Sequence, residues 1–335
     1  MEACFACMPP QPLQEQGTIH FRITDPLVRA SFENWTGHTE TSWHYQDFQQ
    51  LSTYIHTLRQ QIPVEYGELI EAAITEESQL SWTIPFQPMN RLAARFEEHD
   101  LLSIIEKRQF RSHMQAIYNQ EKHIFGFEFL LRPTEGGPDF RPNELFDAAK
   151  RAGLQSFLDR EARLSAIAAS AFHLPRGIKR FINFLPSSIY DPNHCLNHTF
   201  RAIQHYKLDP QDFIFEVVET EKIEDLAHLK AIFETYKEHG MKVAMDDVGT
   251  GYASTEVLLQ LKPDIIKIDR TLIDHCDQRT EKQELIQELV DISSSIGAQV
   301  LAEGIERVEE HRWCKQAGIS LFQGYLFGKP APFPF

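Results

Sequence analysis

The chain has 335 residues, of which 42% are hydrophobic and 24% are charged, and its formal net charge is −15. This length allows one barrel domain of roughly 230–250 residues and a smaller module, and the acidic balance argues against polymeric nucleic acid or an anionic membrane as a partner. No apolar run approaches the ~20 residues that span a bilayer, and the N-terminus lacks the pattern of a signal peptide, so we expect a cytoplasmic protein without a membrane span.

The five cysteines are an odd number and are scattered, so they do not form the pattern of a disulfide framework. Cys4 and Cys7 have the spacing of half a zinc site, but no second close cysteine pair follows. The alternatives are a zinc site completed by other ligands and a pair of reduced thiols. The sequence favours the thiols.

The first 98 residues predict a small α+β module after a lead-in rich in Pro and Gln. Alternation favours strands over residues 18–23 and 82–84, and helical periods cover residues 45–61 and 67–77. A connecting helix over residues 89–109 carries an apolar stripe. No group of residues in this module has the pattern of a catalytic or metal-binding site, so a regulatory, sensory or docking role is inferred from its position alone.

From residue 99 to residue 335, short apolar segments alternate with helical patterns, and a polar residue ends each apolar segment. These polar residues are Asn183, Glu216, Asp246, Lys267, Glu303 and Gln323. They lie roughly 20 to 36 residues apart, about one strand–helix unit each. In a (β/α)8 barrel the carboxyl ends of the strands meet at one mouth. The sequence therefore predicts an α/β fold of the (β/α)8 TIM type with these side chains gathered at its mouth.

Two adjacent carboxylates, Asp246 and Asp247, end one of these strands and precede a loop bracketed by Gly249 and Gly251. Neighbouring carboxylates repel each other when water is excluded, so a positive charge should compensate them. Hard divalent cations prefer oxygen ligands of this kind. The alternative is an acidic turn that caps the following helix.

Glu128 interrupts the apolar strand predicted over residues 122–131, and a buried glutamate is costly unless it is paired or binds a metal. Arg132 is a possible ion-pair partner, but its planar guanidinium is equally suited to a phosphate. Lys267 should remain charged beside so many carboxylates, either in a simple salt bridge or as a positioning group.

Taken in order, these segments resemble the EAL-domain family of bacterial cyclic di-GMP phosphodiesterases over residues 99–335. The motifs that carry the resemblance are Gln115-Ala116-Ile117, Glu128-Phe129-Leu130-Leu131-Arg132, Asn183, Glu216-Val217-Val218-Glu219, Asp246-Asp247-Val248-Gly249-Thr250-Gly251, Lys267-Ile268-Asp269, Ala302-Glu303-Gly304-Ile305-Glu306 and Gln323-Gly324-Tyr325. Phe129, Val218 and Val248 depart from the family pattern, but none of these changes removes a metal ligand.

The resemblance implies a barrel whose first strand is antiparallel to the others, and hydrolysis of cyclic di-GMP to linear pGpG by water attack assisted by two ions of Mg²⁺ or Mn²⁺. The implied metal ligands are Glu128, Asn183, Glu216, Asp246 and Asp247. The implied catalytic residues are Glu303, Lys267 and Asp247, and the implied substrate contacts are Gln115, Leu130, Arg132 and Gln323. Glu219 would anchor the loop at residues 247–254, and a homodimer through the barrel is implied.

Two other functions are compatible with the same residues. One is a catalytically weak EAL domain that acts as a cyclic di-GMP receptor or a protein-interaction module. The other is metal-dependent hydrolysis of a different phosphoester on the same barrel.

Overall fold

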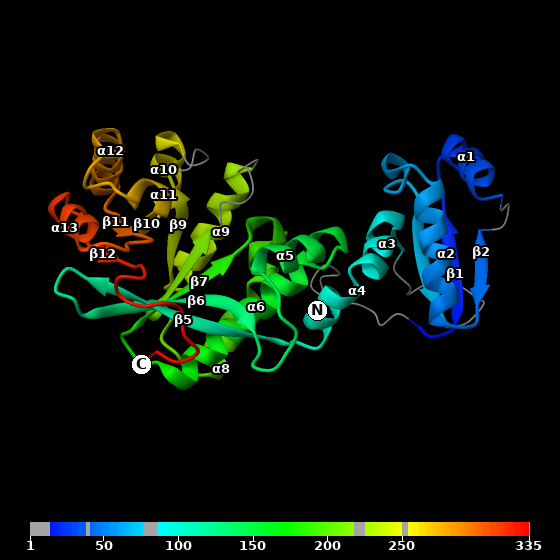
Figure 1. Cartoon of the computed structure of the whole chain (residues 1–335), viewed down its shortest axis with the longest axis horizontal. Helices are drawn as coiled ribbons and strands as arrows, with labels where there is room; N and C mark the ends of the chain where they lie inside the picture. The colour runs from blue at the N-terminus through cyan, green and yellow to red at the C-terminus, as the bar shows by residue number, and fades with distance from the viewer. Residues whose placement is uncertain (1–13, 38–40, 77–85, 218–224, 250–253, 335) are drawn as a thin grey trace. The chain divides into compact units, whose positions relative to one another are not determined.

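The computed structural model describes residues 14–37, 41–76, 86–217, 225–249 and 254–334 (Figure 1). Among the described residues the chain forms two compact units, one within residues 110–135 and 159–334 and one within residues 14–109 and 136–158. The units interleave along the chain, so the predicted boundary after residue 98 remains a prediction. The expectations for Cys4, Cys7, Val218, Glu219 and the strand at residues 82–84 lie outside the described residues.

The N-terminal unit contains a four-stranded sheet with the order β2-β1-β3-β4. Its strands are β1 (Gly17–Arg22), β2 (Ser42–Tyr45), β3 (Glu71–Thr75) and β4 (Gln87–Pro88), and its first two helices are α1 (Pro26–Thr36) and α2 (Phe48–Gln61). The carboxylates of Asp25 and Asp47 accept backbone N–H bonds at the starts of α1 and α2. Ile19, Leu51 and Ile55 lie in the apolar core between helix and sheet.

The helix predicted over residues 67–77 is wrong. The structure has a 3₁₀ turn at Val64–Tyr66 followed by β3, which pairs antiparallel with β1. Ala72 and Ala73 are both buried, so the segment lacks the simple alternation of a half-buried strand. Long-range pairing with β1 decides its conformation here, as tertiary context often does.

The connecting segment is two helices rather than one, α3 (Met89–Glu97) and α4 (His99–Glu106). Glu98 lies between them with non-helical dihedrals, and its carboxylate accepts a 2.9 Å hydrogen bond from Arg151 Nε. Arg151 belongs to α5 (Pro142–Arg151), which packs with α3 and α4 in the same unit.

The second unit is a closed eight-stranded barrel with the strand order β10-β11-β12-β5-β6-β7-β8-β9. The strands are β5 (Phe110–Asn119), β6 (Ile124–Pro133), β7 (Lys179–Phe184), β8 (Phe213–Val217), β9 (Lys242–Val248), β10 (Ile265–Ile268), β11 (Gln299–Ala302) and β12 (Leu321–Phe322). β5 is antiparallel to both of its neighbours, and all other neighbouring pairs are parallel. The predicted TIM-type barrel with an antiparallel first strand is confirmed.

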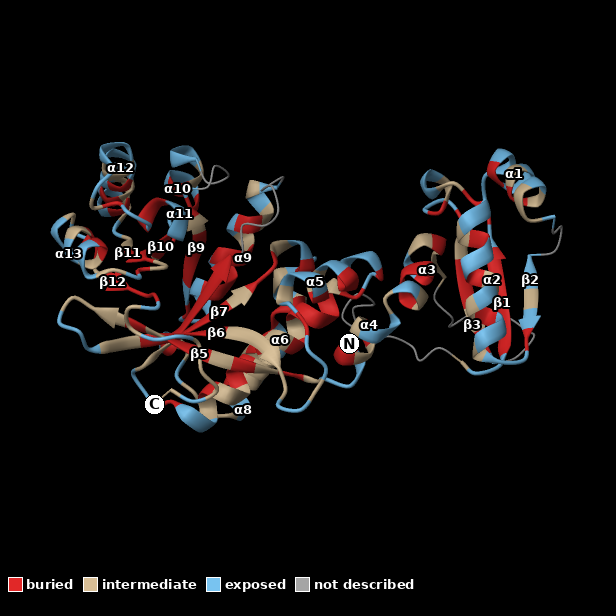
Figure 2. Cartoon of the chain, in the orientation of Figure 1, coloured by how far each residue is buried: buried red, intermediate tan, exposed pale blue. Residues whose placement is uncertain are grey.

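Helices connect the parallel strands as the sequence predicted. They are α6 (Gln155–His173), α7 (Pro192–Cys195), α8 (Asn197–His205), α9 (Leu226–Glu238), α10 (Thr255–Leu261), α11 (Arg270–Ile273), α12 (Thr280–Ile296) and α13 (Val308–Gln316). The inner strands are buried, whereas the helices are exposed on their outer faces (Figure 2). None of the helices among the described residues combines the length and the apolar character needed to cross a membrane.

An apolar layer fills the barrel interior below the mouth. Its members are Ile117, Phe125, Phe181, Ile214, Ala244, Ile265, Leu301 and Leu321. Side chains two positions apart on a strand share a face, so the next inward layer is polar. That layer contains Gln115, Asn183, Glu216, Asp246, Lys267, Glu303 and Gln323. On β5 the count runs backwards, from Ile117 to Gln115, because this strand is antiparallel.

Candidate metal centre at the barrel mouth

Lys267 lies at the centre of the polar layer and is 1% exposed. Its Nζ is 2.7 Å from Glu303 Oε1, 2.8 Å from Asp246 Oδ1 and 3.0 Å from Glu216 Oε1. A fourth carboxylate, that of Glu128, is 3.8 Å away. One ammonium group therefore faces four carboxylates, which leaves an excess of negative charge in a buried place.

This excess of charge shifts the acid–base equilibria of the site. Burial, and then repulsion from neighbouring carboxylates, raises the pKa of Glu216, Asp246 and Glu303, although Lys267 lowers it. The pKa of Asp247 is raised to about 6 by burial and by Asp246. Burial lowers the pKa of Lys267, but the surrounding carboxylates outweigh it and hold that pKa well above its usual value. Lys267 is therefore charged, as expected.

The carboxylates form two groups whose oxygens lie close enough to hold a cation. Glu128, Glu216 and Asp246 make one group, and Asp246, Asp247 and Glu303 make the other. Asp246 is common to both. Glu216 is 0% exposed, and apart from the Lys267 ammonium 3.0 Å from its Oε1, its oxygens have no hydrogen-bond partner among the residues that the structure describes. Oxygen-only donors with an unsatisfied buried carboxylate are suited to hard divalent cations.

Glu128 is held from both sides by side-chain amides. Asn183 Nδ2 donates to Glu128 Oε1 at 3.2 Å, and Gln323 Nε2 donates to Glu128 Oε2 at 2.7 Å. Gln115 lies directly opposite Glu128 in the β5–β6 register, and its Nε2 donates to the carbonyl of Gly328 at 3.1 Å. The bonds from Asn183 and Gln323 fix the orientation of the Glu128 carboxylate from the ends of β7 and β12.

The chain turns sharply directly after Asp246. Asp247 has a left-handed backbone (φ 51°), and its N–H donates to Asp246 Oδ1 at 2.9 Å. Gly249 follows with φ 109°, and a Cβ at this position would lie 2.3 Å from Leu272 Cδ1, so the turn requires glycine. The N-cap of the next helix, α10, is Ser254 rather than either aspartate. Among the described contacts, the acidic-turn alternative therefore has no capping bond to support it.

A cavity of about 280 Å³ opens above these groups. It is lined by Gln115, Glu128, Leu130, Asp246, Asp247, Lys267, Arg270, Glu303, Gly304, Glu306, Gln323, Gly324 and Tyr325. Asn183, Glu216 and Arg132 do not line it. The guanidinium of Arg132 donates to the carbonyl of Leu131 and has no ion pair with Glu128, so the predicted alternative of an Arg132–Glu128 salt bridge is absent from the described contacts.

Sequence reasoning missed Arg270 and Tyr325 as lining residues. Arg270 Nη2 pairs with Glu306 Oε1 at 2.9 Å across the mouth. Arg270 directly follows the Lys267-Ile268-Asp269 motif, so its place just past a strand end was a usable signal. Asp269, in contrast, is structural, since its carboxylate accepts the N–H of Thr271 at the start of α11.

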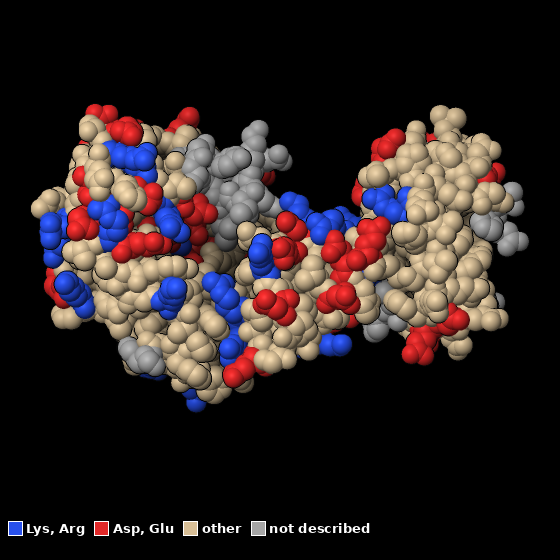
Figure 3. Space-filling view, in the orientation of Figure 1, with Lys and Arg blue, Asp and Glu red and all other residues tan. Residues whose placement is uncertain are grey.

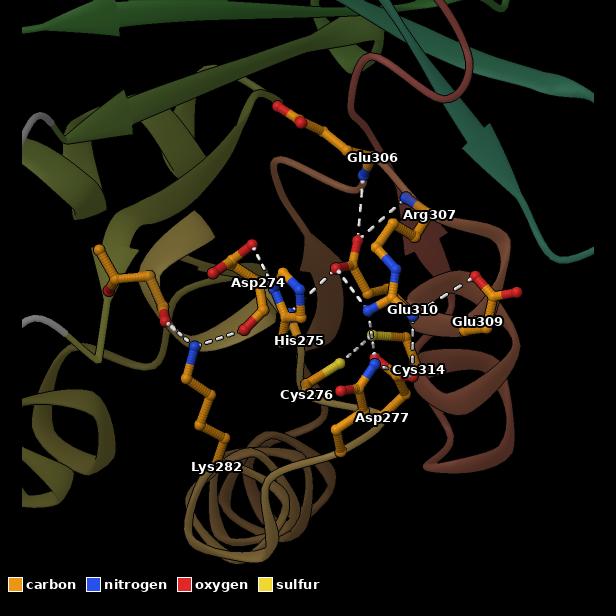
Figure 4. Close-up of polar contacts among 12 residues, drawn as sticks. Asp274, His275, Cys276, Asp277, Lys282, Glu306, Arg307, Glu309, Glu310 and Cys314 are labelled. Atoms are coloured by element: carbon orange, nitrogen blue, oxygen red, sulfur yellow. Dashed lines mark hydrogen bonds and ion pairs between the residues drawn. The ribbon is translucent and has the colours of Figure 1, made fainter.

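A second cluster of ionisable groups supports the loops after β10 and β11 (Figure 4). The buried carboxylate of Glu310 accepts the backbone N–H groups of His275, Glu306 and Arg307 at 3.0–3.1 Å. Asp274, His275 and Glu310 also satisfy the spacing of a metal site. Because Glu310 already accepts three hydrogen bonds, we interpret this cluster as a brace between the loops that carry Arg270 and Glu303.

Outside the mouth, acidic and basic side chains are interspersed on the face of the barrel that is in view in Figure 3. Concentrated charge of one sign is therefore a property of the buried site rather than of this surface.

Comparison with known proteins places these features in a family. The model of the EAL domain matches residues 98–330. A curated relative from Escherichia coli K12, the probable cyclic di-GMP phosphodiesterase PdeB, is 28% identical over 237 residues, which are 70% of this chain and 45% of PdeB. The chain thus spans about half or less of the length of these curated relatives.

Solved structures give the same result. A standalone EAL protein from Vibrio cholerae O395 in its c-di-GMP-bound form has a TM-score of 0.60 and 34% identity, covering 66% of this chain and 92% of that one. The manganese and cyclic di-GMP complex of Klebsiella pneumoniae BlrP1 at pH 6 has a TM-score of 0.61 and 28% identity, covering 72% and 65%. With the antiparallel first strand and the motifs at the ends of the barrel strands, this chain belongs to the EAL-domain family.

Proposed function

We propose that the protein is a metal-dependent phosphodiesterase that hydrolyses cyclic di-GMP to linear pGpG by water attack on one phosphodiester. The observation that carries this proposal is the pair of carboxylate groups that share Asp246 around the buried Lys267. Relatives named as cyclic di-GMP phosphodiesterases support the choice of substrate.

The charge of the site supports two divalent ions. Five carboxylates and one ammonium gather here, which gives a formal charge of −4. Two ions of Mg²⁺ or Mn²⁺ would neutralise this charge, and the oxygen donors are those that such ions prefer. Glu128, Asn183, Glu216 and Asp246 would hold one ion, and Asp246 with Asp247 the other. Bound there, the ions would lower the pKa of water and offset the charge of the phosphate.

Lys267 and Glu303 would position and activate the attacking water. Lys267 holds Glu303 and Asp246 within 2.8 Å of its Nζ, so it fixes the position of both carboxylates. Glu303 lines the cavity and is placed to accept a proton from the attacking water.

Substrate groups would contact the other walls of the mouth. Leu130 and Tyr325 line the cavity and offer apolar surface to a purine base. The amides of Gln115 and Gln323 line the bottom of the cavity. Arg132 lies one inward-facing position beyond Leu130 on β6, where its guanidinium would bind phosphate.

Single-turnover hydrolysis of cyclic di-GMP tests this proposal. The purified protein should form pGpG in Mg²⁺ or Mn²⁺, and EDTA should stop the reaction. Glu303→Ala should slow the reaction by about 10²- to 10⁴-fold, because a positioned proton acceptor contributes about that much. Glu309→Gln, which changes an exposed carboxylate on the same side of the barrel, is the matched control and should retain full activity.

Two other results would contradict this proposal. Tight binding of cyclic di-GMP without product would identify a receptor. The bulky Phe129, which is 4% exposed beside Glu128, would then be the first residue to replace with a smaller one. Faster cleavage of an unrelated phosphoester would reject cyclic di-GMP as the substrate.

A further inference from the structure

The β5–β6 ribbon continues past the barrel wall. β6 pairs with β7 only as far as Phe129, and β12 reaches only Tyr118 and Asn119 of β5. The residues beyond, Phe110–His113 on β5 and Leu130–Pro133 on β6, still pair with each other in regular register (Figure 1). The C-terminal tail joins the outer edge of this extension through mutual backbone hydrogen bonds of Met114 and Ala331.

One face of this extension continues the wall of the active-site cavity. Gln115 and Glu128 are register partners that line the cavity, and Leu130 lines it one inward-facing position further out. By the strand period of two, His113 follows on this face opposite Leu130, and the pair Arg111 and Arg132 comes next.

Two arginines directly opposite each other are an unfavourable cross-strand pair. Arg111 is in ion-pair range of Glu135 at 3.7 Å, but that carboxylate is 89% exposed, so it offsets little of the charge. Among the described residues Arg132 has no ion pair, and its hydrogen bond goes to a backbone carbonyl. The positive charge of this face therefore lacks a buried counter-charge.

Two polar atoms on the same face are buried without a hydrogen-bond partner among the described residues. They are Nε of Arg111 and Nε2 of His113. Burial, and then Arg111 and Arg132, lower the pKa of His113, whereas the backbone of Pro330 raises it. A bound anion would satisfy these atoms and relieve the repulsion between the arginines.

We propose that Arg111, with Arg132 and His113, forms a subsite for the phosphate of the dinucleotide that is not being cleaved. This assignment rests on the proposed function. Planar guanidinium groups recognise phosphate oxygens in pairs, and the subsite lies on the same ribbon face as Glu128, further from the metal ligands. Arg111 would thereby make the enzyme selective for a substrate with two phosphates.

The test compares two substrates in Arg111→Gln, with Arg312→Gln as the control that removes one exposed positive charge elsewhere on the barrel. Loss of a charge-assisted contact should lower kcat/KM for cyclic di-GMP about 10- to 100-fold. It should leave cleavage of bis(p-nitrophenyl) phosphate, which has a single phosphate, within about 2-fold. The Arg312 variant should match the wild type on both substrates.

Equal loss on both substrates, or loss on neither, would overturn the subsite while leaving the proposed function intact. If the wild type cleaves neither substrate, the proposed function fails, and calorimetric binding of cyclic di-GMP in Mn²⁺ then decides the subsite. In that case Arg111→Gln should weaken binding by the same factor and reduce its salt dependence. Unchanged binding would reject the subsite as well.

Discussion

The two ends of the barrel both contain buried ion pairs, but they differ in whether the charges are matched. At the base, Arg180 is 1% exposed, and Asp212 accepts from Lys179 Nζ at 3.0 Å and lies 3.3 Å from Arg180 Nη1. Arg180 also donates to the carbonyls of Leu174, Pro175 and Ile178. At the mouth, the single Lys267 faces several carboxylates, and Glu216 has no polar partner other than that ammonium among the described contacts.

The difference separates a structural ion pair from a site prepared for a ligand. At the base the chain provides nearly every partner that the buried charges need. At the mouth the chain provides too few cations, and burial with mutual repulsion raises the pKa of the carboxylates. A buried cluster with an unbalanced charge is stabilised only when ions from solution complete it.

The sharpest test of this contrast is a matched pair of substitutions. Asp212→Asn at the base should lower the free energy of unfolding by about 3–5 kcal/mol, because it leaves a buried cation without its counter-charge. Asp246→Asn at the mouth should leave the metal-free protein at least as stable as the wild type while abolishing hydrolysis. Urea unfolding in EDTA measures both.

Equal destabilisation by the two substitutions would mean that Asp246 is an ordinary ion-pair partner of Lys267. The ion pairs at the base and at the mouth would then both be structural.

Metal addition should have the next largest effect. At a concentration of 100 times Kd, a bound ion stabilises the folded state by about 2.7 kcal/mol. For a domain of this size that corresponds to a rise in Tm of roughly 5–10 °C. Thermal unfolding with and without Mn²⁺ measures it. Glu216→Gln keeps the shape of this fully buried side chain and should remove most of the rise, whereas Glu309→Gln should not.

An unchanged Tm in the wild type at millimolar Mn²⁺ would argue that the carboxylates do not bind metal. A rise that persists in Glu216→Gln would place the metal elsewhere, and the brace of Asp274, His275 and Glu310 would be the first alternative.

The position of the site could be predicted from the sequence because the barrel imposes a simple rule. From β7 onward, each strand leads to a polar residue two positions after an apolar one, as in Ile214 and Glu216 or Ile265 and Lys267. That period alone places these side chains on one inner face, and the strand–helix spacing brings them to one mouth.

Features that depend on non-local packing were not predictable in the same way. Residues 71–75 carry a helical pattern, yet they pair with β1, and only that pairing decides the outcome. The left-handed backbone of Asp247 and the close approach of Gly249 to Leu272, which belongs to the next strand–helix unit, are seen only in the folded chain. Likewise, the Arg111–Arg132 pair becomes visible only once the register of β5 and β6 is known.

The smallest expected effect is a pH dependence of stability in the metal-free protein. The pKa of Asp247 is about 6 in the folded state, raised by burial and Asp246 from 3.8. Between these two values the folded chain keeps a proton that the unfolded chain has lost. Stability should therefore fall as pH rises from about 4 to about 6, since the unfolded state binds fewer protons. Burial also raises the pKa of Glu216 and Glu303, so their titration contributes to stability in the same direction.

Asp247→Asn should remove part of this slope, on the order of 1 kcal/mol once solvent screening is allowed for. Unfolding by urea in EDTA at pH 4.5 and pH 7.5 measures it as the difference between variant and wild type, which cancels the titration of groups remote from the site. If the free energy of unfolding changed with pH equally in the variant and the wild type, the ionisation of Asp247 would not affect stability. In Mn²⁺ the wild-type profile should reverse and rise with pH, because the bound ion favours the charged carboxylates that burial alone disfavours.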